Sequence, residues 1–411
     1  MEAFKQLGIE DSLLKSLKEQ EFKTPTEIQA KTIPEVLQGK DVIAGSATGS
    51  GKTLAFGSAI VQKISKGKGI KALIMTPTRE LAEQVHSSLK TFAKHKPLNI
   101  TTVYGGVSIE PQMKALKNAD VVVGTPGRIL DHISRDTIDL GKIEYLVLDE
   151  ADRMLDMGFL PDVEKIMKSC PAKKRQTMLF SATLPPEVSK LSKKFMKDPV
   201  KINAVQHVDP KKLTQVYYDV PNKLKFSLLV HLLKKESSGL VMVFCNSRNM
   251  TDTVAKNLQK QDFDAMAIHG GLTQAQRTKT LSRFNSNKAL ILVCTDVAAR
   301  GLDIPGVSHV YNYDVPNDSK QYIHRIGRTA RAGESGRAII LLSEKDHDNF
   351  QRVLQDNDVK VKKMDKPYIQ MVGFQTDSKP KKDNGPRGRF DSGQGRGPRR
   401  SKPQSRRPRR S

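Results

Sequence analysis

The eight residues "SATGSGKT", Ser46 to Thr53, constrain the fold of this chain most. They follow a short β-branched stretch, "DVIAG", and precede "LAFGSAIVQKI", which has the spacing of a helix. A glycine-containing loop between a strand and a helix brings backbone N–H groups to phosphates at the helix N-terminus. Lys52 would neutralise β/γ-phosphate charge and the Thr53 hydroxyl would ligate Mg²⁺. The stretch therefore predicts a phosphate-binding loop in an α/β fold; the competing interpretation is a Gly/Ser turn before an unrelated lysine.

A second polar cluster ends another apolar stretch. "YLVLDEADRM" begins at Tyr145 and places Asp149, Glu150 and Asp152 directly after a strand-like segment. Grouped carboxylates repel one another and raise each other's pKa unless a cation compensates. Downstream of a phosphate loop, Asp149 can orient magnesium and Glu150 can orient or deprotonate the attacking water. Asp152 is expected to couple the site to neighbouring loops; a solvated turn is the alternative.

Short β-branched runs alternate with helix-like stretches and indicate two α/β domains of similar build. Runs that are apolar on both faces are typical of buried parallel strands in βαβ units. Beyond "DVIAG", the strand candidates are "KALIMT", "ITTVYGG", "DVVVGT", "IEYLVLDE" and "QTMLFSAT" in the first half, and "LVMVFC", "DAMAIHGG", "ALILVCTD", "VSHVYNYDV" and "GRAIILLSE" in the second. The polar, proline-containing "AVQHVDPKKL" between the two series predicts a linker.

The charge of the chain restricts its partners. Its 411 residues include 69 Lys and Arg against 44 Asp and Glu, a net charge of +25, which favours nucleic acid or an acidic membrane surface. Three cysteines without a CxxC pair disfavour a disulfide scaffold or a zinc site. No secretory signal and no apolar run long enough to span a membrane are recognised, so a cytoplasmic protein is expected.

The composition changes at about Gln375, where Gly, Pro, Ser and Arg begin to dominate. From Gln375 to Ser411, thirteen Lys or Arg against three Asp give 13 − 3 = +10, which leaves 25 − 10 = +15 for the rest of the chain. Such a segment cannot bury enough apolar area to offset its chain entropy, so it should be disordered. We expect it to tether nucleic acid electrostatically; a solubilising extension is the alternative.

The stretch "HRIGRTAR", His324 to Arg331, holds three arginines and a glycine in eight residues. Arg328 and Arg331 are three apart, so a helix would project both to the same side. Two guanidiniums over the γ-phosphate would act as arginine fingers, an effect worth roughly 10³–10⁵ in rate. RNA contact or a salt-bridged face is the alternative for each arginine.

With these elements in place, the chain resembles the DEAD-box ATP-dependent RNA helicases of helicase superfamily two over roughly residues 1–365. The resemblance rests on an ordered series of motifs: "EFKTPTEIQ", "SATGSGKT", "PTRELAEQ", "YGG", "TPGR", "DEAD", "SAT", "VFCNSR", "QAQR", "CTDVAARGLD" and "HRIGRTAR". "TPGR" or "YGG" alone would be an ordinary turn. Two departures are visible, because Ser46 stands where the family often has Ala and Ala330 where it often has Gly.

The resemblance implies roles for individual residues. Phe22 would stack on adenine, Gln29 would hydrogen-bond its edge, and Asp303 would accept from the ribose hydroxyls. The ATP phosphates would be held by Ser46, Ala47, Thr48, Gly49, Ser50, Gly51, Lys52 and Thr53, Mg²⁺ by Thr53 and Asp149, and catalysis would rest on Lys52, Asp149, Glu150, Arg328 and Arg331. RNA sugar and phosphate would be held by Arg79, Gly106, Thr125 and Arg128 of the first domain and by Arg277 and Thr295 of the second.

The fold implied by the resemblance is α/β, with two tandem RecA-like parallel-sheet domains of the P-loop NTPase type and a disordered basic C-terminal tail. The expected boundaries are 1–29 for an N-terminal helix and Q-motif region, 30–205 for the ATP-binding domain, 206–213 for a linker, 214–366 for the C-terminal domain and 367–411 for the tail.

The implied function is ATP-dependent local unwinding of RNA duplexes or remodelling of RNA–protein complexes. Grip by Arg, Thr and backbone N–H groups fixes register without reading sequence, so recognition should be sequence-tolerant and salt-sensitive. The chain also resembles the bacterial RhlE-type subgroup, which implies ribosomal precursors or RNA-decay machinery as partners. A DNA-directed translocase of the same superfamily and an ATP-independent RNA chaperone or annealing protein remain as alternatives.

Overall fold

A computed structural model describes residues 1–46, 49–204, 212–236, 239–299, 302, 304, 306–330, 334–356 and 359–376. Several residues named above lie outside these ranges: Ala47, Thr48, Asp303 and Arg331, most of the linker, and the basic tail from residue 377. Both sheets belong to the compact unit Met1–Gln375 and are described one after the other.

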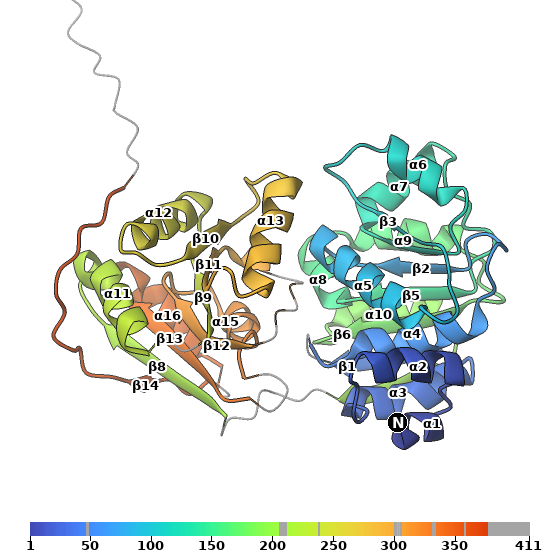
Figure 1. Cartoon of the computed structure of the whole chain (residues 1–411), viewed down its shortest axis with the longest axis horizontal. Helices are drawn as coiled ribbons and strands as arrows, with labels where there is room; N and C mark the ends of the chain where they lie inside the picture. Colours follow the sequence, from blue (N-terminus) through green and yellow to red (C-terminus); the bar gives the residue numbers. More distant parts are fainter. Residues whose placement is uncertain are drawn as a thin grey trace, which may run out of the picture. The chain divides into compact units, whose positions relative to one another are not determined.

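The first lobe is built on a seven-stranded, fully parallel sheet in the order β3-β4-β2-β5-β6-β1-β7, with helices on its faces (Figure 1). Its strands are β1 (Val42–Ser46), β2 (Ala72–Met75), β3 (Ile100–Val103), β4 (Val121–Gly124), β5 (Tyr145–Asp149), β6 (Gln176–Ser181) and β7 (Val200–Ala204). Its helices are α1 (Glu2–Gln6), α2 (Asp11–Glu19), α3 (Glu27–Leu37), α4 (Lys52–Lys63), α5 (Arg79–Phe92), α6 (Glu110–Leu116), α7 (Pro126–Ser134), α8 (Ala151–Asp156), α9 (Leu160–Ser169) and α10 (Pro186–Phe195).

Both faces of this sheet are buried at its centre, which explains why the central strands are continuously apolar. Ile74 packs with one hydrophobic cluster, which the helices α1 to α5 cover, whereas its neighbours Leu73 and Met75 pack with the cluster under α6 to α10. Successive strand side chains point to opposite faces, so a strand between two helix layers needs apolar residues at every position. The N-terminal helices belong to this core, because Phe4 and Leu13 are fully buried in it.

The second lobe repeats the same strand order, β10-β11-β9-β12-β13-β8-β14, again fully parallel. Its strands are β8 (Leu213–Asp219), β9 (Leu240–Phe244), β10 (Ala265–Ile268), β11 (Ile291–Cys294), β12 (Val307–Asn312), β13 (Gly336–Leu342) and β14 (Lys362–Lys363). Its helices are α11 (Lys225–Glu236), α12 (Arg248–Gln259), α13 (Gln274–Asn285), α14 (Asp296–Ala299), α15 (Ser319–Ile326) and α16 (His347–Leu354), with 3₁₀ turns at Asn222–Leu224 and Glu344–Asp346. The prediction of two parallel α/β domains of similar build is confirmed.

Residues 367–375, which were expected to begin the disordered tail, instead pack against the second lobe. Ile369, Val372 and Phe374 pack against the second-lobe core, and the Phe374 ring lies 4.9 Å from the Phe226 ring. The Val372 N–H donates to Ser227 Oγ at 3.1 Å, and the Gln375 N–H donates to Asn257 Oδ1 at 2.9 Å. Residues 367–375 are therefore a segment fastened along the lobe, which we call the C-terminal strap.

Within the described ranges, no helix is both long enough and apolar enough to cross a bilayer.

Candidate nucleotide and RNA site

The predicted site residues of the first lobe gather at the carboxyl ends of parallel strands. The phosphate loop follows β1, Arg79 follows β2, Gly106 follows β3, Thr125 follows β4 and Asp149 ends β5. Carboxyl ends of parallel strands share one edge of a sheet, and ligands bind in α/β proteins at that edge. The fold thus brings together residues that lie up to a hundred positions apart in the chain.

The phosphate loop turns sharply into α4. Gly49 and Gly51 have φ values of 81° and 86°, a conformation that disfavours residues with a Cβ. Lys52 begins α4 and is 5% exposed, and its Nζ lies 2.9 Å from Asp149 Oδ1 and 3.7 Å from Glu150 Oε1. Burial opposes the charge of Lys52, but Asp149 and Glu150 outweigh it and raise the Lys52 pKa.

The carboxylate of Asp149 has unsatisfied hydrogen-bonding capacity. It is fully buried, and within the described ranges neither of its oxygens accepts a well-formed hydrogen bond, so the Lys52 ammonium is its close partner. Burial raises the pKa of Asp149 despite that ammonium. An orphaned buried carboxylate oxygen is uncommon and calls for an explanation, and oxygen ligands of this kind suit Mg²⁺.

The neighbouring acids are compensated by different groups. Glu150 adopts a left-handed conformation (φ 55°, ψ 53°) before α8, and its Oε2 accepts from Arg153 Nη1 at 2.6 Å in a buried ion pair. Asp152 Oδ2 accepts from the N–H and Oγ1 of Thr183, at 3.0 and 2.9 Å. The Asp152 N–H donates to Ser181 Oγ at 3.1 Å, which links the "DEAD" turn to the "SAT" loop.

The Q-motif-like stretch is bonded directly to the phosphate loop. Gln29 Nε2 donates to the Gly51 carbonyl at 3.0 Å, and its Oε1 accepts from the Thr26 N–H at 3.0 Å. Thr26 Oγ1 donates to the Ser50 carbonyl at 2.8 Å. Phe22 is half-buried and packs edge-on against Phe4 and Phe92. The role of Thr26 was missed, although the T-x-x-Q spacing of a capping box could have indicated it.

On the RNA side, Gly106 and Arg79 are tightly apposed. Gly106 has φ 80°, and a Cβ built on it would collide with the Arg79 guanidinium, so a side chain there would require the guanidinium to move. Thr78 caps α5 by accepting from the Leu81 N–H at 3.3 Å, which fixes the start of the helix that carries Arg79.

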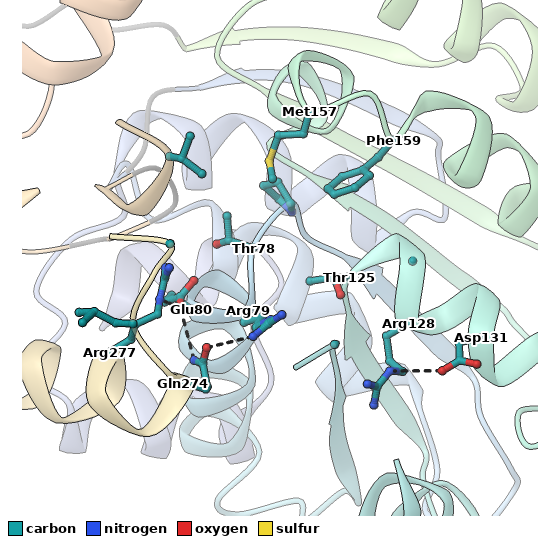
Figure 2. Close-up of a pocket in the computed structure, with 16 residues that line it drawn as sticks. Thr78, Arg79, Glu80, Thr125, Arg128, Asp131, Met157, Phe159, Gln274 and Arg277 are labelled. Carbon is teal, nitrogen blue, oxygen red and sulfur yellow. Dashed lines mark hydrogen bonds and ion pairs between the residues drawn. The ribbon is translucent and has the colours of Figure 1, made fainter. Parts of the chain in front are cut away.

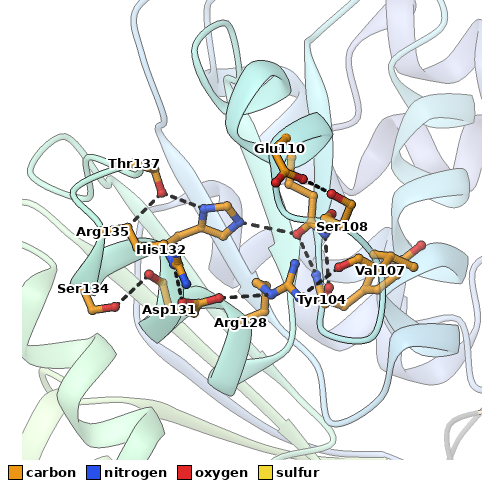
Figure 3. A network of polar contacts seen from close by, with 11 residues as sticks. Tyr104, Val107, Ser108, Glu110, Arg128, Asp131, His132, Ser134, Arg135 and Thr137 are labelled. Carbon is orange, nitrogen blue, oxygen red and sulfur yellow. Dashed lines mark hydrogen bonds and ion pairs between the residues drawn. The ribbon is translucent and has the colours of Figure 1, made fainter.

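A polar network fastens the "YGG" loop to α7 (Figure 3). Arg128 Nη2 donates to the Val107 carbonyl at 3.1 Å. The Gln112 amide accepts from the Tyr104 N–H and donates to the Tyr104 and Ser108 carbonyls, all within 3.2 Å. His132 lies 3.4 Å from Gln112 Oε1 through Nε2. Gln112 and His132 were not predicted, since their importance depends on contacts between separate loops.

Residues assigned to RNA line the pocket in Figure 2. Arg277 Nε donates to Glu80 Oε1 at 2.8 Å, and Gln274 Nε2 donates to the same oxygen at 3.3 Å. Arg79, Thr125 and Arg128 line this pocket as well. Thr295 is buried at the end of β11, where its carbonyl accepts from the N–H groups of α14.

The expectation that a helix carries Arg328 is wrong. The helix α15 ends at Ile326, and Arg328 follows in a turn. Arg328 is 3% exposed, and its Nη1 donates to the Leu302 carbonyl of its own lobe. Arg325 proves to be structural: this 1%-exposed guanidinium donates to Asp296, Asn246, Asn312 and the Asp314 carbonyl.

Two family profiles match the chain. The family described as "DEAD/DEAH box helicase" covers residues 26–191, and "Helicase conserved C-terminal domain" covers residues 224–333. The DEAD-box ATP-dependent RNA helicase CshA of Bacillus cereus is 43% identical over 373 residues, which are 90% of this chain and 71% of that protein. The ATP-dependent RNA helicase CshA of Limosilactobacillus reuteri is 45% identical over 354 residues, 85% of this chain and 71% of its own length.

Solved structures show the same architecture. Dbp5 of S. cerevisiae, bound to RNA and ADP BeF3, superposes with a TM-score of 0.80 at 30% identity over 89% of this chain and 96% of its own. Mss116, bound to single-stranded RNA and UDP-BeF, gives 0.77 at 31% identity over 88% of this chain and 78% of its own. The two parallel-sheet lobes are thus the predicted tandem RecA-like domains, whereas the RhlE-type placement stays a prediction. The chain belongs to the DEAD-box family of ATP-dependent RNA helicases.

Proposed function

We propose that this chain separates short RNA duplexes and remodels RNA–protein complexes locally, with ATP hydrolysis stimulated by RNA. The observation that carries the proposal is the buried Lys52–Asp149 pair, 2.9 Å apart, beside a phosphate loop. Two opposite charges buried without further hydrogen bonds at Asp149 stabilise a fold poorly, whereas they suit a site that waits for phosphate and a cation.

ATP would bind by separating the Lys52–Asp149 ion pair. The phosphates take over the Lys52 ammonium, and Phe22 packs on the adenine. A carboxamide has two N–H donors and an oxygen with two lone pairs. Gln29 uses one N–H and one lone pair on Gly51 and Thr26, so one of each is left for the adenine edge. Asp303, outside the described ranges, is proposed to hold the ribose.

Asp149 and Thr53 are proposed to hold Mg²⁺. The fit is supported by the orphaned Asp149 oxygens and by the preference of Mg²⁺ for oxygen ligands. Bound there, the ion would supply positive charge against the phosphates. Once Lys52 moves to the phosphates, Asp149 would otherwise be a buried carboxylate without any counter-charge.

Glu150 is proposed to orient and deprotonate the attacking water. Its left-handed backbone and its ion pair with Arg153 fix the carboxylate beside Asp149. Arg328 and Arg331 would stabilise the γ-phosphate from the second lobe, and Arg328 would exchange its bond to Leu302 for that contact. The Asp152 bonds to Ser181 and Thr183 would transmit the nucleotide state to the "SAT" loop.

RNA is proposed to be held through its backbone by Arg79, Gly106, Thr125, Arg128, Arg277 and Thr295. Such contacts position a strand without reading its bases, which favours sequence-tolerant binding. Cytoplasmic RNAs such as ribosomal precursors or decay substrates are the targets that we propose on the subgroup resemblance.

The direct test replaces the proposed base. We expect Glu150→Gln to retain ATP and RNA binding but to lower RNA-stimulated ATP turnover by about 10²-fold or more, because a positioned base contributes roughly 10²–10⁴. Steady-state ATPase assays with oligouridine and filter binding with a non-cleavable ATP analogue measure both. Glu144→Gln, at the opposite end of β5, is the matched control. Full RNA-stimulated turnover in Glu150→Gln would show that Glu150 has another role.

Two further comparisons separate the other function classes. Stimulation of the ATPase by DNA as strongly as by RNA would indicate a DNA-directed translocase. Strand separation that proceeds equally without ATP would indicate an annealing protein.

A further inference from the structure

Five lysines gather at the amino edge of the first-lobe sheet. Lys173, Lys174 and Lys197 line an open depression of about 850 Å³, and Lys193 and Lys201 line an adjoining one of about 530 Å³. All five side chains are exposed. We call these five residues the amino-edge lysine face.

This face lies at the edge opposite the nucleotide site. Asp41, Glu144 and Arg175 stand just before β1, β5 and β6, and they line the larger depression. The phosphate loop and Asp149 stand at the other ends of β1 and β5. Five residues of strand separate the two edges by roughly 15 Å, so one ligand contact cannot serve both.

The half-buried Arg175 and the buried Asp41 hold the lysine-bearing loops in place. Arg175 Nη1 donates to the carbonyls of Met167 and Cys170 at 2.9 and 3.2 Å, and Nη2 donates to the Phe195 carbonyl at 3.1 Å. Asp41 accepts from the N–H groups of Thr177 and Lys197, both at 2.7 Å. These bonds join the turn before β6 to the turn before β7, so the lysines project from a preformed surface.

The positive charge of this face is neutralised only in part. Nearby Lys40 and Lys194 pair with Glu35 and Glu164. The five lysines of the face have no ion pair within the part of the chain that the structure describes. Three acids line the larger depression: Asp41 interacts electrostatically with Arg175 and Lys197, Glu144 pairs with Lys71, and Asp198 is the third. They are outnumbered by the cations that line the same depression, Lys40, Lys173, Lys174, Arg175, Lys194 and Lys197.

We propose that the amino-edge lysine face binds the phosphate backbone of RNA that extends beyond the segment held at the carboxyl edge. The proposal rests on the proposed function, because it presupposes an RNA substrate. Lysines make point-charge contacts that tolerate varied backbone geometry, and each one that neutralises a phosphate releases counterions. The face would thus favour long or structured RNA over short oligonucleotides.

The composition of the face disfavours a protein partner. Protein interfaces are depleted in Lys and depend on large apolar or aromatic anchors. None of the exposed large hydrophobic residues within the described ranges lines either depression. Tyr145, Phe195 and Met196, which do line the larger one, are half-buried.

The test compares two triple variants of the full chain. K173Q/K174Q/K197Q neutralises three lysines of the face, and K5Q/K15Q/K18Q removes the same charge from exposed positions on α1 and α2. Binding of single-stranded RNA of about 40 and about 10 nucleotides is measured by fluorescence anisotropy over a salt series. Three lost phosphate contacts should reduce the slope of log affinity against log salt by about 2, since each contributes roughly 0.7 for single strands.

We expect the face variant to bind the long RNA roughly three- to tenfold more weakly at moderate salt than the control, with unchanged binding of the short RNA and unchanged RNA-saturated ATPase. Equal long-RNA binding by the two triple variants overturns the inference. The inference is also overturned if the face variant keeps its RNA binding but, unlike the control, no longer binds polyglutamate. If the short RNA fails to stimulate the ATPase of the unmodified chain, the proposed function itself fails.

Discussion

At the scale of single residues, the structure explains how three acids can follow one another at the end of β5. Asp149 faces Lys52, Glu150 faces Arg153, and Asp152 is held by Thr183, so each carboxylate has its own compensating group. The sequence indicated the need for a cation but not its source. Lys52 is recognisable from the loop motif, whereas Arg153 is an ordinary charged residue until its burial is known.

Replacing Arg153 by methionine should therefore destabilise the first lobe. The Arg153 and Glu150 side chains are 5% and 4% exposed, and removal of one partner of a buried pair costs about 3–5 kcal/mol. Urea unfolding followed by circular dichroism measures the loss. Lys71→Met breaks the more exposed pair with Glu144 and should cost less than about 1 kcal/mol. Equal costs for the two substitutions would mean that Glu150 finds another partner.

Ala330 adopts a strained backbone conformation. Its φ is 53°, and a residue with a Cβ pays about 1–2 kcal/mol for the left-handed region. Because glycine also gains entropy in the unfolded chain, Ala330→Gly should stabilise the protein by a net of about 0.5–1 kcal/mol. Ala115→Gly, at an exposed position in α6, should instead destabilise by about 1 kcal/mol. Thermal unfolding of the two variants checks the opposite signs.

At the scale of elements, the network around α7 makes stability depend on pH. Burial, together with the nearby Arg128 charge, lowers the pKa of His132 below its ordinary value of about 6.5. As the pH falls through that ordinary value, His132 binds protons more readily in the unfolded chain than in the folded chain, so stability falls. We expect the free energy of unfolding to drop between about pH 7.5 and 5.5 by more in the unmodified chain than in His132→Asn. Identical drops would exclude this residue as the source.

The elements that the sequence predicted well are the central strands, since burial on both faces leaves continuous apolar runs such as "ALIM" and "LVMVF". The strand β7 was missed because it is a sheet edge with Lys201 and Asn203 exposed, and β8 because polar residues interrupt it. The positions of the strand-end motifs were predictable from their order. Their mutual bonds, such as Gln29 with Gly51, were not, because they depend on how separate elements pack.

At the scale of the whole molecule, the first lobe has two charged edges with different chemistry. The carboxyl edge combines buried acids with cations that are already paired, as Lys52 and Arg153 are. The amino edge carries lysines on a rigid base and no comparable buried acid pair within the described ranges. The chain carries a net charge of +15 before its basic tail, and part of this excess lies on the amino-edge lysine face. Composition alone could not assign it to that position.

Two truncations separate the roles of the tail and of the C-terminal strap. Removal of residues 377–411 should weaken RNA binding and reduce its salt dependence, because it deletes a strongly basic segment, while RNA-saturated ATP turnover stays nearly unchanged. Removal of residues 367–411 should in addition destabilise the second lobe by about 2–4 kcal/mol, because Ile369, Val372 and Phe374 would no longer cover its core. Calorimetry distinguishes the two, since only the longer deletion should lower an unfolding midpoint. An unchanged midpoint after the longer deletion would show that the strap contributes no net stability.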